Sequence, residues 1–107
     1  MELNQYSIIL VNLDPTQGSE IQKTRPCVIV SPNEMNKYLK TVVVCPMTTN
    51  SKKYPTRVPI MHDGKRGMIV IDQIRTIDKS RIIKVFDKLN KTEIEMCKDV
   101  LKETFVD

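Results

Sequence analysis

The chain has 107 residues, which is one domain's length and too short for two ordinary hydrophobic cores. Hydrophobic residues make up 40% and charged residues 28% of it, a balance that is normal for a folded globular protein and excludes wholesale disorder. No apolar run approaches the roughly 20 residues of a transmembrane helix. The first five residues lack the basic and apolar regions of a signal peptide. We therefore expect a single domain, residues 1–107, that is cytoplasmic and has no membrane partner.

The net charge of +4 is unevenly distributed along the chain. Residues 1–91 carry 15 Lys and Arg against 8 Asp and Glu, whereas residues 92–107 carry 2 against 5. A basic body favours polyanionic partners, nucleic acid first. A merely solubilising surface is the alternative that charge alone leaves open.

Short β-branched runs separated by proline- or glycine-bearing turns predict a mainly β chain. Pro46 is expected to end the third run, and Pro59 marks the fourth as an edge strand. A short turn or helical piece is expected from Pro32 to Tyr38, and a polar turn from His62 to Gly67. The predicted strands are Ser7–Leu13, Pro26–Ser31, Thr41–Cys45, Arg57–Met61, Met68–Ile77 and Ile82–Phe86.

The last segment predicts a helix packed on the sheet. Thr92 and Glu95 have the spacing of a capping box at its start. The apolar residues that follow recur at helical spacing and indicate a core-facing stripe; they are Ile94, Cys97, Val100, Leu101 and Phe105. The elements together predict a small antiparallel barrel, SH3-like or OB-like, with a C-terminal helix.

Most catalytic constellations are absent from the sequence. There is no dinucleotide-binding or phosphate-binding glycine motif. Cys27, Cys45 and Cys97 have no zinc-binding spacing and are expected to be buried free thiols. His62 is the chain's one histidine, and its polar surroundings predict a solvated turn residue. We therefore expect no metal and no cofactor.

Polar side chains at the ends of two predicted strands remain as candidates. Arg25 precedes one β-branched run, and Thr48 and Thr49 follow another. Neighbouring strands in a small barrel bring such ends together, and an arginine fork with a hydroxyl donor suits a phosphate. Ordinary turn chemistry is the alternative for these residues. Tyr54 is a candidate for stacking on a base.

Three blocks in order resemble the MazF/PemK family of bacterial toxins. The first is Leu13 to Glu20 with Lys23 to Pro32, the second Val44 to Lys52 with Tyr54 and Pro55, and the third Asp72 to Lys79. The resemblance implies a PemK/CcdB-like, SH3-like antiparallel barrel that forms a homodimer. It also implies a metal-independent, sequence-specific endoribonuclease that acts on single-stranded RNA in the bacterial cytoplasm and is neutralised by a cognate antitoxin protein.

The resemblance also assigns residues. The family's catalytic arginine and threonine match Arg25 and Thr48. The residues expected to contact RNA or support the site are Gln17, Glu20, Lys23, Thr49, Asn50, Ser51, Lys52, Lys53, Asp72 and Gln73. The antitoxin's disordered acidic segment would lie in the same basic groove.

The expected reaction is attack by a ribose 2′-hydroxyl on its own 3′-phosphate, which leaves a 2′,3′-cyclic phosphate and a 5′-hydroxyl. Arginine is a poor proton acceptor at neutral pH, so Glu20 and Asp72 stay open as alternative bases. Val70 departs from the pattern of relatives with a basic side chain at that position, which favours the mechanism based on Arg25 and Thr48.

Two other functions remain as alternatives. One is a CcdB-like toxin of the same fold that binds DNA gyrase through exposed residues of its C-terminal helix. The other is a non-catalytic nucleic-acid-binding barrel, which would retain RNA without cleaving it.

Overall fold

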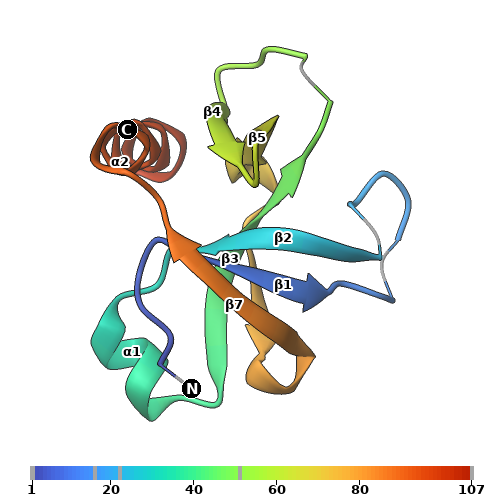
Figure 1. Cartoon of the computed structure of the whole chain (residues 1–107), viewed down its shortest axis with the longest axis vertical. Helices are drawn as coiled ribbons and strands as arrows, with labels where there is room; N and C mark the ends of the chain where they lie inside the picture. Colours follow the sequence, from blue (N-terminus) through green and yellow to red (C-terminus); the bar gives the residue numbers. More distant parts are fainter. Residues whose placement is uncertain (1, 16, 22, 51, 107) are drawn as a thin grey trace.

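The computed structural model describes residues 2–15, 17–21, 23–50 and 52–106. Over these residues, seven antiparallel strands form one sheet in the order β4-β5-β3-β2-β1-β7, and β6 pairs with β3 off this path. The sheet curls into a half-barrel (Figure 1), which confirms the predicted mainly β fold. The strands are β1 Ser7–Asn12, β2 Thr24–Ile29, β3 Thr41–Thr48, β4 Arg57–His62, β5 Lys65–Val70, β6 Arg75–Asp78 and β7 Ile82–Lys88.

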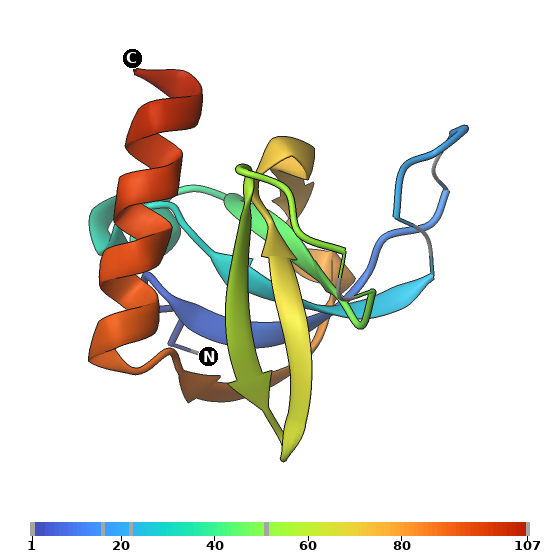
Figure 2. The ribbon, with the colours of Figure 1, turned by 90° about the horizontal axis from the view of Figure 1, so that it is seen from above.

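Two helices accompany the sheet within the described part of the chain: α1 Asn33–Tyr38 and α2 Lys91–Phe105. Figure 2 shows α2 along one side of the curled sheet, and the loop that follows β1 projecting on the opposite side. Two single-turn 3-10 helices, Ile71–Gln73 and Lys79–Arg81, flank β6.

Apolar side chains are buried on both faces of the central strands, which explains their continuous β-branched runs. Ile8 of β1 and Val28 of β2 belong to a core shared with the β4–β5 hairpin and α2. Their neighbours Ile9 and Ile29 point into a second core on the opposite face, lined also by Ile77 of β6. Alternation along each strand therefore divides the apolar residues between two cores.

All three cysteines are free and buried, as expected. Burial raises the pKa of the Cys27 thiol to about 12 and that of Cys97 to about 11, and it also raises the pKa of Cys45. The protonated thiols pack as small apolar groups.

The prediction that Pro46 ends the third strand is wrong, because β3 continues to Thr48. Pro46 stands opposite Cys27 of β2, between Val44, the last β3 residue paired with β6, and Met47, the first one paired with β5. The missing proline N–H falls where β3 exchanges one partner strand for another, so neither ladder is interrupted.

The single predicted strand Met68–Ile77 is also wrong. The apolar run ends with β5 at Val70, the 3-10 turn Ile71–Gln73 redirects the chain, and β6 then pairs with the first half of β3. Continuous hydrophobicity did not reveal this change of direction, since each piece is buried against a different neighbour.

The start of α2 differs from the predicted capping box of Thr92 and Glu95. The Asn90 side chain accepts the Glu93 N–H at 2.8 Å, and the Glu93 carboxylate accepts the Asn90 N–H at 3.0 Å. The apolar stripe ends at Leu101, because Phe105 is 53% exposed.

Side-chain contacts tie the edge strand β4 to the other edge strand, β7, and to α2. The His62 ring on β4 meets the Phe86 ring on β7 edge-on, with centroids 5.0 Å apart. The second Glu93 oxygen accepts the Met61 N–H of β4 at 3.1 Å. This carboxylate thus caps α2 and occupies part of an otherwise open sheet edge.

Among the described residues, no helix is long and apolar enough to cross a bilayer.

Glu93→Ala removes the carboxylate that accepts the Asn90 N–H and the Met61 N–H, so these two backbone donors lose their acceptor. We expect it to lower the free energy of unfolding by about 1–3 kcal/mol, measured by urea denaturation. Glu95→Ala removes only an exposed ion pair with Lys98 at 3.9 Å and should cost less than about 1 kcal/mol. Equal losses in the two variants would refute this role of Glu93.

Candidate functional site

Arg25 and Thr48 line one hollow of about 300 Å³. Arg25 lies half-buried near the start of β2, opposite Val11 of β1. Thr48 is the last residue of β3 and is also half-buried. The hollow therefore has a guanidinium and a hydroxyl on its wall, both reachable from solvent.

Strand register explains why these two side chains meet. Cys27 stands opposite Pro46, so Arg25 and Thr48 are each two residues beyond that pair, on the same face of their strands. The Thr48 hydroxyl oxygen accepts the Asn50 N–H at 3.2 Å. Its own proton remains available to a ligand oxygen.

The β4–β5 hairpin forms the other wall of this hollow. Its two turn residues, Asp63 and Gly64, have φ values of 52° and 72°, as a tight hairpin turn requires. The turn places His62 opposite Lys65, and both line the hollow together with Arg66. His62, predicted to be a solvated turn residue, is instead the last residue of β4, and its ring is half-buried against Phe86.

Gly67 lets the hairpin approach Thr48 closely. A Cβ at this position would lie 3.0 Å from the Thr48 carbonyl oxygen. The next residue, Met68, pairs directly with Thr48. The position of Thr48 in the hollow thus depends on Gly67, which has no side chain and directly precedes the β5 residue that pairs with Thr48.

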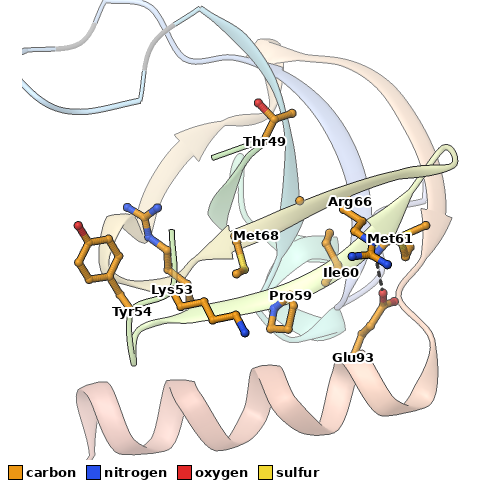
Figure 3. A pocket seen from close by; sticks show the side chains of 11 residues that line it. Thr49, Lys53, Tyr54, Pro59, Ile60, Met61, Arg66, Met68 and Glu93 are labelled. Carbon is orange, nitrogen blue, oxygen red and sulfur yellow. Dashed lines mark hydrogen bonds between the residues drawn. The ribbon is translucent and has the colours of Figure 1, made fainter. Parts of the chain in front are cut away.

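A larger hollow of about 650 Å³ lies between the hairpin and α2. Figure 3 shows Lys53 and Tyr54 at one end of it and Arg66, Met61 and Glu93 at the other. The two hollows are adjacent, since they share the lining residues Thr49, Arg66 and Gly67, and the pair of hollows is called the groove. Basic side chains outnumber acidic ones on its described walls: Arg25, Lys53, Arg57, Lys65 and Arg66 against Asp63 and Glu93.

Tyr54 carries the one aromatic ring of the larger hollow's described lining and is 44% exposed. The Arg57 guanidinium lies over its ring at 4.7 Å, and the Lys52 ammonium at 5.6 Å. Two cations near one ring, partly open to solvent, make a surface on which a base can stack.

Glu20, Asp72 and Gln73 come together in a third hollow of about 190 Å³. Its described lining has no residue in common with that of the Arg25–Thr48 hollow. The Gln73 side-chain oxygen accepts the Ile21 N–H at 2.8 Å, which ties down the loop after β1. The Asp72 carboxylate accepts the Thr56 hydroxyl at 2.8 Å.

The remaining predicted residues that the structure describes are exposed on loops, Gln17 and Lys23 between β1 and β2, and Asn50 and Lys52 between β3 and β4. The Gln17 N–H donates to the Glu20 carboxylate at 2.9 Å, and the Lys23 N–H donates to the Asp14 carboxylate at 2.9 Å. Asn50 accepts the Lys52 N–H at 3.0 Å. Ser51 lies outside the described residues.

Sequence reasoning missed the contribution of the hairpin to the groove. The sequence predicts only a polar turn for His62, Lys65 and Arg66. The Asp63-Gly64 dipeptide between two β-rich runs is the characteristic sequence of a two-residue hairpin loop. That signal would have placed His62 opposite Lys65, although not beside Arg25.

The described residues contain no group of three or more His, Cys, Asp or Glu side chains that could hold a metal ion.

Comparison with known proteins places the chain among toxins. Residues 4–105 match the family described as PemK-like, MazF-like toxin of type II toxin-antitoxin system. The "Endoribonuclease MazF" of Staphylococcus saprophyticus is 41% identical over 86 residues, which are 75% of this chain and 72% of that protein.

Solved structures agree on the fold. The chain is similar to MazF from Deinococcus radiodurans, with a TM-score of 0.84, 23% identity and 94% of each chain covered. It is also similar to a mycobacterial endoribonuclease solved with its cognate antitoxin, with a TM-score of 0.79 and 20% identity over 94% of this chain and 91% of that one.

Gly67→Ala tests the close approach of β5 to Thr48. The added methyl forces the two backbones apart by a few tenths of an ångström, so the amide resonances of Thr48 and Thr49 should shift in a two-dimensional NMR spectrum. In Gly64→Ala the added Cβ meets nothing within 4 Å but stands at a φ of 72°, so the strain should shift resonances of the hairpin turn and leave those of Thr48 and Thr49 in place. Unchanged Thr48 and Thr49 resonances in Gly67→Ala would contradict the proposed contact.

Proposed function

Since the chain belongs to the PemK-like, MazF-like toxin family of type II toxin–antitoxin systems, we propose that it is a sequence-specific, metal-independent endoribonuclease toxin. Its substrate is single-stranded RNA, messenger RNA above all, and cleavage inhibits translation and growth. The 41% identity to an endoribonuclease supports this activity. The observation that carries the proposal is the shared hollow of Arg25 and Thr48 within a basic groove.

The reaction that this site suits is attack of a ribose 2′-hydroxyl on the adjacent 3′-phosphate. Negative charge builds up on the non-bridging phosphate oxygens as the new P–O bond forms. The Arg25 fork neutralises that charge through paired N–H donors, and the Thr48 hydroxyl donates to one of the same oxygens. The products are a 2′,3′-cyclic phosphate and a 5′-hydroxyl.

A metal is not required for this chemistry, because the nucleophile belongs to the substrate. Positioning the 2′-hydroxyl in line with the leaving oxygen and stabilising the phosphate charge are the two demands. The basic groove holds the strand on either side of the cleaved bond. Tyr54, Lys52 and Lys53 bind a neighbouring nucleotide by stacking and charge, with Thr49 and Asn50 beside it.

Residues 1–107 act as one toxin domain in the bacterial cytoplasm, as a homodimer with a cognate antitoxin. The family's place in toxin–antitoxin systems supports the antitoxin, as does a similar endoribonuclease solved with its own. An acidic, disordered antitoxin segment that folds on binding would compete with RNA for the basic groove.

Arg25→Ala and Thr48→Ala should each lower the rate of RNA cleavage about 100-fold or more, because each removes a donor to the developing phosphate charge. The wild-type protein, assayed in EDTA on a long mixed RNA, should produce 5′-hydroxyl ends that a polynucleotide kinase labels. Sequencing these ends gives the cleavage site. Lys98→Ala, on the exposed face of α2, is the control that keeps the wild-type rate.

RNA left intact by the wild-type protein would reject the nuclease. Retention of that RNA would then indicate a non-catalytic binding module, and inhibition of DNA gyrase would indicate the CcdB-like alternative.

RNA affinity should fall steeply with salt, because the groove neutralises phosphates. Each phosphate contact on a single strand contributes about 0.7 to the slope of log K against log salt concentration. Lys53→Gln should therefore lower the slope by about 0.7, measured by fluorescence anisotropy with a 2′-O-methyl RNA that cannot be cleaved. Lys98→Gln should leave the slope unchanged, and equal slopes in all three proteins would contradict a groove-bound backbone.

A further inference from the structure

We propose that His62 is the general base of the RNA cleavage, accepting the proton of the attacking 2′-hydroxyl. This inference rests on the proposed endoribonuclease function and assigns the proton acceptor that Arg25 and Thr48 do not supply. Histidine is the side chain that most often transfers protons near neutral pH.

His62 lies on the wall of the Arg25–Thr48 hollow, although it is far from both residues in the sequence. It ends β4 and stands opposite Lys65 across the two-residue turn. Its half-buried ring meets Phe86 edge-on at 5.0 Å between centroids. The ring is therefore held by packing at the wall of the hollow, as proton transfer to a bound substrate requires.

The other candidate bases fit this position less well. Glu20 and Asp72 line the third hollow, together with Gln73, and Asp72 is already bonded to the Thr56 hydroxyl. Asp63 does line the Arg25–Thr48 hollow, but it is exposed in the hairpin turn at a φ of 52°. Of the possible proton acceptors among the described side chains of this wall, His62 is the one held by a ring contact.

Charged groups surround His62 from several elements. The cations are Arg25 of β2, Lys65 and Arg66 of β5, and Lys84 of β7, which lies over the Phe86 ring at 5.2 Å. The anions are Asp63 in the turn and Glu93 of α2, bonded to the Met61 amide next to His62. The cations attract an RNA phosphate into the hollow, which brings the adjacent 2′-hydroxyl to the imidazole.

The step balances without any further reactant. The neutral imidazole takes the 2′-hydroxyl proton while the 2′-oxygen forms a bond to phosphorus. The bond between phosphorus and the 5′-oxygen breaks, and that oxygen leaves with the electron pair and takes a proton from water. The imidazolium then returns its proton to solvent.

The test is the pH dependence of kcat for untagged wild-type protein and for His62→Gln. His62 is the chain's single histidine, so one imidazole resonance per chain reports its titration by NMR. In the wild type, kcat should rise with pH in step with the imidazole deprotonation that this resonance reports. His62→Gln should lose this rise and lower kcat about 100-fold or more.

Two further measurements distinguish a general base from a residue that only supports the structure. His62→Gln should keep the wild-type affinity for a 2′-O-methyl RNA within about twofold and an unchanged circular dichroism spectrum, while Asp63→Asn should keep the rise of kcat with pH. Loss of the rise in Asp63→Asn alone would make Asp63 the base and overturn the proposal. An unchanged kcat profile in His62→Gln would also overturn it.

A substrate with sulfur in place of the 5′-bridging oxygen distinguishes the two directions of proton transfer. Its leaving group needs no proton, so it rescues a variant that lacks a general acid and does not rescue one that lacks a general base. His62→Gln should stay slow on this substrate, and recovery of the wild-type rate would overturn the assignment as base. If the wild-type protein cleaves no RNA, the proposed function itself fails. If His62→Gln cleaves RNA as the wild type does, the proposed function stands and only the assignment of His62 fails.

Discussion

The double pairing of β3 is the constraint on which the rest of the structure depends. Residues 41–44 of β3 pair with β6, residues 44–46 pair with β2, and the last two residues pair with β5. Because β3 changes partners at Pro46, one strand both centres the sheet and carries the β4–β5 hairpin. Thr48 lies at this junction, next to the position where Gly67 leaves room for the hairpin. The position of the candidate catalytic hydroxyl is thus set by backbone pairing.

The contacts that close the curled sheet also position the walls of the groove. Within the described residues the edge strands β4 and β7 do not pair, and side chains hold β4 in place instead: His62 meets Phe86 of β7, and Glu93 of α2 binds the Met61 amide. These contacts bring the hairpin tip over the hollow that Arg25 lines. Mutations that loosen the closure would therefore change the groove as well as the stability.

The distribution of charge is consistent with a substrate that brings its own nucleophile. The groove's described walls carry several fixed cations, one exposed tyrosine and one histidine, and the acidic cluster of Glu20 and Asp72 lies in a separate hollow. Phosphate binding, stacking and proton transfer are the three tasks that such a set of side chains performs well. The buried cysteines contribute packing, since burial keeps their thiols protonated.

Local patterns in the sequence determined the strands, the C-terminal helix, the buried thiols and the joint position of Arg25 and Thr48. These features depend on short-range periodicity and on the expectation that neighbouring strand ends meet. The turn inside Met68–Ile77, the cap at Asn90 and the position of His62 were decided by tertiary structure. Each of them depends on which distant strand or helix packs against a residue: β6 against β3, Glu93 against Met61, His62 against Phe86. Burial against a partner far away in the chain leaves no periodic signal in the sequence around it.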